Sequence, residues 1–232
     1  EAGDREVTHE TTPAEVQITT YRSDGGYSDN RRPDNVSYET ELTKDLERRD
    51  FTMNAIAWNP STNAYIDPYE GIKDIKDKSI KCVLYADVRF KEDALRMLRA
   101  VRFSTTLGFG ISHETLDAIG KNAGLIKSIS AERIRDEFMK IIDSDAPAMG
   151  VDLLQKTGLL KYFIPELEEG IGCEQKGAHI YDVYQHLLHA LQHAADKGFD
   201  RGIRLTALFH DIGKPATRRY DRTKDKYTFF GH

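Results

Sequence analysis

The apolar residues of the stretch KEDALRMLRAVRF, residues 91–103, recur at the spacing of an α-helix. Four of them form one core-facing stripe at about 100° per residue: Ala94, Met97, Leu98 and Val101. Three arginines lie off that stripe and follow an acidic pair, Glu92 and Asp93: Arg96, Arg99 and Arg102. We expect a helix from Glu92 to about Leu107, begun by the two acids because the helix dipole favours negative charge there. Its arginine face is either an ion-paired surface, with pairs such as Glu92–Arg96 and Asp93–Arg96, or a binding surface, and the local pattern leaves both open.

Helical spacing continues to about residue 211, whereas the residues before position 91 are mixed. The predicted later helices cover 114–123, 131–142, 146–157, 181–196 and 201–211, with Ser130 as a simple N-cap. Earlier, alternating residues predict a half-buried strand over 14–22, followed by a long polar loop, SDGGYSDNRRPDN, at 23–35. Turns are expected at Asn59-Pro60 and Asp67-Pro68.

Composition excludes several classes of protein. The 232 residues are 39% hydrophobic and 31% charged, which is typical of a soluble globular protein, and no apolar run approaches the roughly 20 residues of a membrane span. Cys82 and Cys173 are far apart and outside any C-x-x-C motif, so we expect reduced thiols in a cytoplasmic protein. The formal charge of −5 gives no global attraction to nucleic acid, so contact with RNA would need a local basic surface. The sequence starts at Glu1 without a signal-like segment, and we expect it to be a fragment.

The stretch RRDFTMNA, residues 48–55, sets polar groups among apolar ones. Guanidinium groups suit phosphate through paired hydrogen bonds, while a carboxylate and an amide suit ribose hydroxyls. A structural Arg–Asp pair that anchors a loop is the alternative, and taken alone this stretch favours it.

Three segments occur in an order and at separations that closely resemble the class II tRNA nucleotidyltransferases, the family of CCA-adding enzymes and bacterial poly(A) polymerases. They are DLERRDFTMNAIA, IDPYEGIKDI and RFKEDALRMLRAVRFSTTLGF. ITTYRSDGGYSD is similar to the strand and flexible loop upstream in that family, and SAERIRDE is similar to its later helical motif. The resemblance implies an α/β nucleotidyltransferase head, truncated at its N-terminus, at 1–81. A helical neck with a nucleotide-recognition helix would follow at 82–144, and a helical body with an incomplete HD-like domain at 145–232.

The resemblance also implies residue roles. Asp93 and Arg96 would bind the incoming base, with Arg96 donating to O2 and N3 of cytosine and Asp93 accepting from the exocyclic amine. Arg99 and Arg102 would face the same pocket or the triphosphate. Arg49 matches the arginine beside the nucleotide, and Asp50 and Asn54 match the ribose-recognition positions.

A histidine-rich region follows in YQHLLHALQH, LFHDIGKPATR and FFGH. Its order resembles the HD metal-dependent phosphohydrolase domain, which implies a divalent transition metal held by His186, His210, Asp211 and His232. Asp211 could bridge two ions. His189 and His193 are expected to be solvated or packed helix residues, and the later aspartate of the HD pattern does not occur before residue 232.

The resemblance implies a tRNA nucleotidyltransferase that adds CCA to tRNA 3′ ends. Its expected partners are tRNA, CTP and ATP, and no association with a membrane is expected. The Asp-x-Asp ligands of its catalytic Mg²⁺ would precede this chain, so no catalytic residue is assigned and the 232 residues alone are expected to be inactive. Gln17 stands where many members have a glutamate, and Glu15 could substitute. The alternatives are a poly(A) or A-adding polymerase, an HD-type phosphohydrolase with an RNA-holding front half, and an RNA-binding remnant. CCA addition is favoured because RRDFTMNAIA and the HD-like region look more like that branch.

Overall fold

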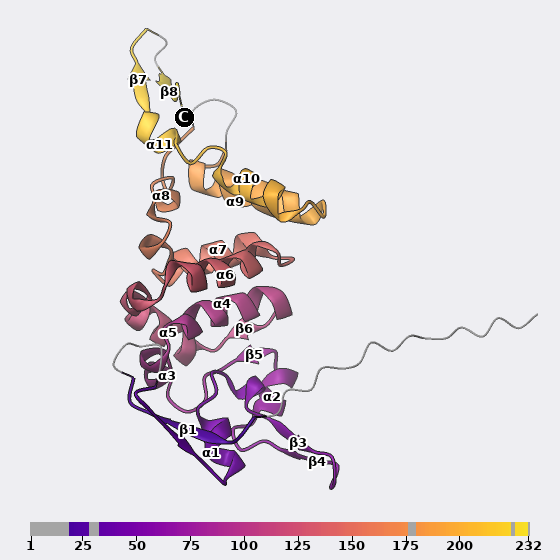
Figure 1. The fold of residues 1–232 in the computed structure, drawn as a ribbon. Coiled ribbons are helices and arrows are strands. Elements are labelled where there is room, and N and C mark those ends of the chain that lie inside the picture. The colour runs from indigo at the N-terminus through magenta and orange to yellow at the C-terminus, as the bar shows by residue number, and fades with distance from the viewer. Residues whose placement is uncertain (1–18, 28–32, 176–179, 224–225, 232) are drawn as a thin grey trace, which may run out of the picture.

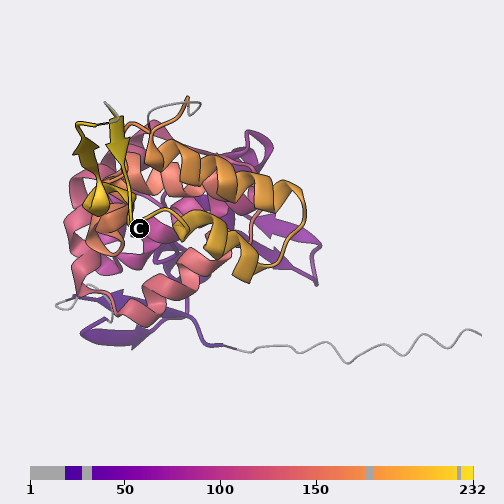
Figure 2. The ribbon, with the colours of Figure 1, turned by 90° about the horizontal axis from the view of Figure 1, so that it is seen from above.

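The structure is a computed structural model that describes residues 19–27, 33–175, 180–223 and 226–231. Its elements follow one another along an elongated molecule, with two hairpins at the N-terminal end, layers of helices in the middle and a third hairpin at the C-terminal end (Figure 1). Seen from above, the C-terminal helices and hairpin lie over the earlier layers (Figure 2). Among the described residues, no helix is long and apolar enough to cross a bilayer.

The secondary structure is mainly helical. The α-helices are α1 Leu42–Glu47, α2 Gly71–Lys76, α3 Ala86–Glu92, α4 Leu95–Leu107, α5 His113–Asn122, α6 Ala131–Ile142, α7 Pro147–Lys156, α8 Pro165–Glu168, α9 Val183–Asp196, α10 Arg201–Phe209 and α11 Lys214–Thr217. The 3-10 helices are η1 Thr52–Asn54, η2 Ala123–Ser128 and η3 Leu160–Tyr162. The strands are β1 Arg22–Gly25, β2 Asn35–Tyr38, β3 Ala57–Asn59, β4 Ala64–Ile66, β5 Ser79–Ile80, β6 Gly110–Ile111, β7 Arg219–Asp221 and β8 Lys226–Thr228.

The strands form two-stranded sheets. Three are antiparallel hairpins, β1–β2, β3–β4 and β7–β8, whereas β5 and β6 pair in parallel and join the front of the chain to the segment after α4. The strand predicted over 14–22 lies largely outside the described residues, and β1 begins only at Arg22. The prediction of a loop over all of 23–35 is wrong at its ends, because residues 23–25 pair with 35–37 as a hairpin.

The helical layers are built on α4. Its predicted stripe is fully buried, and the burial extends to Leu95 and Ala100 because α4 packs against both α6 and α7. α6 presents the same kind of face, with Ile134, Phe138 and Ile141 at helical spacing. One continuous apolar cluster runs from residue 51 to residue 208, so α9 and α10 share the core of α4. Gly108 ends α4 at φ +66°, a left-handed conformation that glycine adopts without strain.

The prediction of one helix from Glu92 is wrong at its start. Glu92 is the last residue of α3, and α4 begins at Leu95. Asp93 between them is extended, at φ −141° and ψ 105°, and its carboxylate accepts the Leu95 backbone N–H at 3.1 Å. A carboxylate that satisfies a free N–H at a helix start competes with a continuous helix, which explains the break.

The other predicted helices are confirmed within a few residues. α6 has the predicted bounds, while α7, α9 and α10 are shorter than expected by one or more residues at their ends. Ser130 occupies the N-cap position of α6, but its side chain makes no capping hydrogen bond. Both cysteines are free and buried, and burial raises the pKa of Cys82 to about 12.

Candidate functional site

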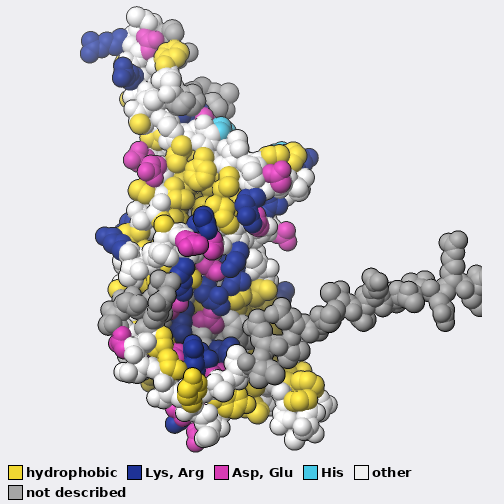
Figure 3. Space-filling model, in the orientation of Figure 1, with side chains coloured by type: hydrophobic (Ala, Val, Ile, Leu, Met, Phe, Trp, Pro, Cys, Tyr) yellow, Lys and Arg dark blue, Asp and Glu magenta, His cyan; other side chains and the backbone are white. Residues whose placement is uncertain are grey.

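An arginine-rich cavity of about 490 Å³ opens where the loop before η1 meets the α3–α4 break and the start of α6. We call it the arginine pocket, and it is lined by Arg48, Arg49, Asp50, Asn54, Asp93, Leu95, Arg96, Arg99, Phe103 and Arg133. Lys and Arg side chains gather on this face of the molecule (Figure 3). Five arginines against two aspartates make the lining suited to an anionic ligand.

Asp50 fixes the loop that forms one wall of the pocket. One of its oxygens accepts the Phe51 backbone N–H at 2.9 Å and the Asn54 amide at 3.0 Å, and the other accepts Arg99 Nε at 2.8 Å. Burial raises the pKa of this carboxyl, but the Arg99 guanidinium and the hydrogen bonds outweigh it, so the pKa lies below its usual value. Gly71 lies behind the loop, and a side chain there would overlap the Thr52 backbone. Asp50 is therefore an ionised anchor shared by the loop and α4.

Arg96 is held at the floor of the pocket. Its guanidinium donates to Glu92 at 2.8 Å, to the Arg48 carbonyl at 2.8 Å and to the Arg89 carbonyl at 3.5 Å. Among the residues that the structure describes, these acceptors engage three of its five N–H groups and leave two for a ligand. Burial raises the pKa of Glu92 above its usual value despite Arg89 and Arg96, so this anchoring carboxylate sits in a poorly solvated place.

Asp93 faces the same space from the α3–α4 break. Arg133 of α6 donates to one of its oxygens at 2.8 Å and to the other at 3.4 Å. The Asp93–Arg96 pair that we considered is replaced by this contact, and Arg96 pairs with Glu92 instead. Asp93 and Arg96, which are expected to recognise one base, thus line one pocket. Arg133 holds Asp93, and Glu92 holds Arg96.

The two later arginines of α4 differ in their surroundings. Arg99 lines the pocket, where it pairs with Asp50. Arg102 is not among the lining residues: it pairs with Glu137 of α6 at 3.1 Å and lies 3.6 Å from the centre of the Phe103 ring. Arg102 therefore links α4 to α6, and its predicted place beside the nucleotide has no support from this geometry.

Arg49 is the most exposed arginine of the pocket, with 44% of its side chain accessible. Its neighbour Arg48 is half as exposed and pairs with Asp45 at 2.7 Å. Arg49 pairs with the other oxygen of Asp45 at 3.0 Å. An exposed guanidinium with one terminal nitrogen on Asp45 is suited to bind a phosphate group.

A second polar cluster lies where α9 faces the end of α10. His186 Nε2 is 3.1 Å from His210 Nε2, and these atoms lie 3.4 and 3.2 Å from Asp211 Oδ2. The three potential ligand atoms lie within 4.8 Å of one another. His210 Nδ1 lies 2.9 Å from the Ala207 carbonyl, which favours a proton on Nδ1 and leaves Nε2 to bind a metal. Lys214 donates to the same Asp211 oxygen at 2.6 Å.

The remaining histidines of the sequence pattern are separate. His189 and His193 are exposed on α9, and His189 stacks against Tyr181 with ring centroids 4.2 Å apart. His232 lies outside the described residues. The structure thus brings together three of the four predicted metal ligands.

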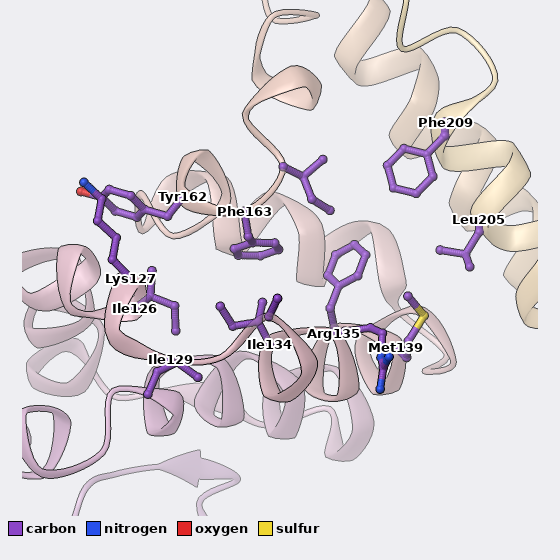
Figure 4. A pocket seen from close by; sticks show the side chains of 13 residues that line it. Ile126, Lys127, Ile129, Ile134, Arg135, Met139, Tyr162, Phe163, Leu205 and Phe209 are labelled. Carbon is purple, nitrogen blue, oxygen red and sulfur yellow. The ribbon is translucent and has the colours of Figure 1, made fainter. Parts of the chain in front are cut away.

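A second cavity, of about 620 Å³, is apolar. Side chains from η2, α6, η3 and α10 face a common space, with Phe163, Leu205 and Phe209 on its upper side and Ile134 and Met139 below (Figure 4). This cavity shares no lining residue with the arginine pocket, and we assign it no role in nucleotide binding.

Sequence reasoning missed Arg133 and Phe103 as parts of the pocket, although it gave Glu92–Arg96 as a possible ion pair. The sequence offered a signal for Arg133, which lies within the stretch SAERIRDE. That stretch matched a family motif without indicating which of its residues reaches the pocket.

Comparison with known protein families matches two separate regions of the chain. Residues 2–81 match the poly A polymerase head domain, and residues 108–171 match the "Probable RNA and SrmB-binding site of polymerase A". The CCA-adding enzyme of Geobacillus thermodenitrificans is 47% identical over 163 residues, which are 70% of this chain and 39% of that protein. The chain belongs to the family of CCA-adding enzymes and poly(A) polymerases.

Further relatives agree with this membership. The CCA-adding enzyme of Levilactobacillus brevis is 40% identical over 71% of this chain and 41% of its own length. A crystal structure of the Bacillus stearothermophilus CCA-adding enzyme in complex with CTP has a TM-score of 0.59 at 32% identity, over 85% of this chain and 49% of that one. A tRNA nucleotidyltransferase complexed with a primer tRNA and an incoming ATP analog has a TM-score of 0.58 at 29% identity, over 74% of this chain and 50% of that one. The chain thus spans about two fifths of the curated relatives that it matches and about half of these solved chains.

Proposed function

We propose that this chain is part of a tRNA nucleotidyltransferase that adds C, C and A to tRNA 3′ ends from CTP and ATP. The observation that carries the proposal is the arginine pocket, where Asp93 and Arg96 line one cavity beside an exposed Arg49. The identity to CCA-adding enzymes supports the choice of reaction. The match of residues 2–81 to the head domain supports a boundary near Lys81, with a neck to about Ser144 and a helical body beyond.

Each side chain of the pocket has chemistry for one part of a nucleotide. The two N–H groups of Arg96 left by its protein partners match the O2 and N3 acceptors of cytosine, and Asp93 would accept from the exocyclic amine. Adenine also carries an exocyclic amine, so the same carboxylate serves ATP. Arg49 would bind phosphate, while Asp50 and Asn54 would face the ribose from the loop.

The transfer step itself needs a metal. Divalent-metal dependence is general for CCA-adding nucleotidyltransferases, and we propose Mg²⁺, which would stabilise the negative charge of the phosphates during attack by the 3′-hydroxyl. We assign no residue of this chain to that ion. The contribution of the chain is to bind and orient the incoming nucleotide.

Incubation of the full-length protein with tRNA that lacks its CCA end, with each nucleotide supplied separately, tests this function. We expect two cytidines to be added from CTP, and one adenosine from ATP only after both cytidines are in place. Long tails from ATP alone would instead support a poly(A) polymerase. A protein that adds nothing to this tRNA would contradict the proposal.

We also propose a divalent-metal site at His186, His210 and Asp211, because two imidazoles and a carboxylate converge there and His210 has Nε2 available. A bound transition metal would supply an activated water for hydrolysis of phosphate esters. The residues of this chain would hold the ion, and Lys214 would keep Asp211 ionised: burial raises the pKa of Asp211, but Lys214 and the two histidines bring it below its usual value.

Calorimetric titration with Mn²⁺ tests the metal site. We expect the full-length protein to bind one Mn²⁺ ion at this site, in addition to any ion at the nucleotide-transfer centre. That binding should be lost in His210→Ala and unchanged in His193→Ala, which removes an exposed histidine of α9. Equal binding by both variants would contradict the assignment.

A further inference from the structure

Asp93 is oriented by a side chain from another part of the fold. One of its oxygens accepts the Leu95 backbone N–H, and both oxygens are engaged by the guanidinium of Arg133. The Leu95 N–H is a local contact to one carboxylate oxygen only. Arg133 comes from α6, 40 residues along the chain, and fixes that rotation with a two-pronged contact.

Arg96 does not depend on Arg133. Its guanidinium is held by Glu92 and by two backbone carbonyls, none of which belongs to α6. In the part of the chain that the structure describes, Asp93 is also the only acidic partner of Arg133. Loss of Arg133 would therefore release Asp93 and leave Arg96 in place.

On this basis we infer that Arg133 determines nucleotide specificity by positioning Asp93 for the exocyclic amine of the base. The inference rests on the function proposed above and adds a residue to it. A carboxylate offers about four acceptor positions, so Arg133 and Leu95 leave room for an amine to donate to Asp93 in the same orientation. CTP and ATP carry such an amine and UTP does not, so the predicted effect of Arg133 is on selectivity rather than on binding of every nucleotide.

An ion pair between α4 and α6 makes this assignment testable. Glu137 lies one turn after Arg133 on α6 and pairs with Arg102 of α4, and the apolar faces of both helices are packed together. The helices therefore stay together without Arg133. An effect of an Arg133 variant on base selection would then come from Asp93 rather than from separation of the helices.

The test compares Arg133→Met and Arg133→Lys in the full-length protein, with Arg135→Met as the matched control. Arg135 lies on the same helix, is exposed and pairs with Asp136. Binding of CTP and UTP is measured by calorimetry, and kcat/KM for each is measured on tRNA without CCA. Thermal unfolding checks that each variant is folded.

We expect Arg133→Met to lower the CTP:UTP selectivity about tenfold, the scale of one good base contact, with UTP binding nearly unchanged. The selectivity of Arg133→Lys should lie between those of Arg133→Met and the wild type, because an ammonium keeps the charge but cannot make the two parallel hydrogen bonds of a guanidinium. The CTP:UTP selectivity of Arg135→Met should equal that of the wild type. In the Asp93→Asn background, Arg133→Met should change selectivity less than about twofold, because it acts through the carboxylate that is already gone.

Wild-type selectivity in a folded Arg133→Met protein would overturn the inference, as would an equal loss in the Asp93→Asn background. These outcomes are distinct from failure of the proposed function. A wild-type protein that binds CTP over UTP without adding it to tRNA would refute CCA addition alone, and the binding data would still test Arg133. A wild-type protein without preference between the two nucleotides would refute both.

Discussion

Replacing Asp50 by asparagine tests the anchor of the arginine pocket. Asp50 is buried and makes contacts with Phe51 and Asn54 through one oxygen and with Arg99 through the other. An amide of the same shape keeps only one acceptor, so its NH₂ group must face either the Arg99 donors or the loop donors. The substitution therefore removes a charge and at least two hydrogen bonds.

The magnitude follows from these contacts. Hydrogen bonds to charged groups contribute about 1.5–3 kcal/mol each, and Arg99 is 32% exposed, so water replaces part of what it loses. We expect Asp50→Asn to lower the free energy of unfolding by about 2–3 kcal/mol and Asp50→Ala by about 3–5 kcal/mol, because the alanine leaves every donor unpaired. Asp136→Asn is the control: its carboxylate is exposed and paired with Arg135, so the change should stay within about 0.5 kcal/mol.

Urea unfolding at several pH values measures these differences. The pKa of Asp50 is lowered by folding, so its stabilisation is fully present above the unfolded pKa of about 3.9 and is lost as pH falls through the folded pKa. The gap between wild type and Asp50→Asn should therefore be constant near neutral pH and should close in acid. A gap at neutral pH no larger than that of Asp136→Asn would refute the role of Asp50 as an anchor.

Gly150→Ala should destabilise the protein by about 1–3 kcal/mol in urea unfolding, because the new methyl would overlap the Ile141 side chain where α7 crosses α6; an unchanged midpoint would show that the helices separate freely. Glu137→Gln should cost about 2 kcal/mol, since it removes the charge facing Arg102 in a mostly buried pair, and a stability equal to wild type would contradict that pairing. Arg49→Ala should weaken CTP and UTP binding about equally, by roughly tenfold in calorimetry at low salt, because a phosphate contact does not read the base; a change in selectivity would place Arg49 at the base instead.

The helical half of the fold was predictable from sequence because its apolar residues repeat at one period. The stripe of α4 and the bounds of α6 follow directly from that repeat, since each buries one face. The break at Asp93 was not predictable in this way, because it depends on a side chain that accepts a local N–H against the helical pattern. The ends of the 23–35 segment were also mispredicted, because polar residues there pair as strands whose bonds are made by the backbone.

The candidate site shows the same division. The residue types and order in RRDFTMNA and EDALRMLR indicated a nucleotide pocket, and the structure brings Arg49, Asp50, Asn54, Asp93, Arg96 and Arg99 to one cavity. Arg102 is not among the residues that line the cavity, and spacing alone cannot show that α6 supplies a carboxylate opposite it. Arg133 was missed for the same reason, since its contact with Asp93 joins two helices far apart in the chain.

A crystal structure of the full-length protein with CTP tests the central claim most directly, because it locates the base. We expect the cytosine amine to lie within hydrogen-bond distance of an Asp93 carboxylate oxygen, with O2 and N3 facing the Arg96 guanidinium. Arg133 should still contact Asp93 in that complex. A cytosine bound elsewhere, or bound in the arginine pocket with its amine turned away from Asp93, would contradict the claim that these side chains select the nucleotide.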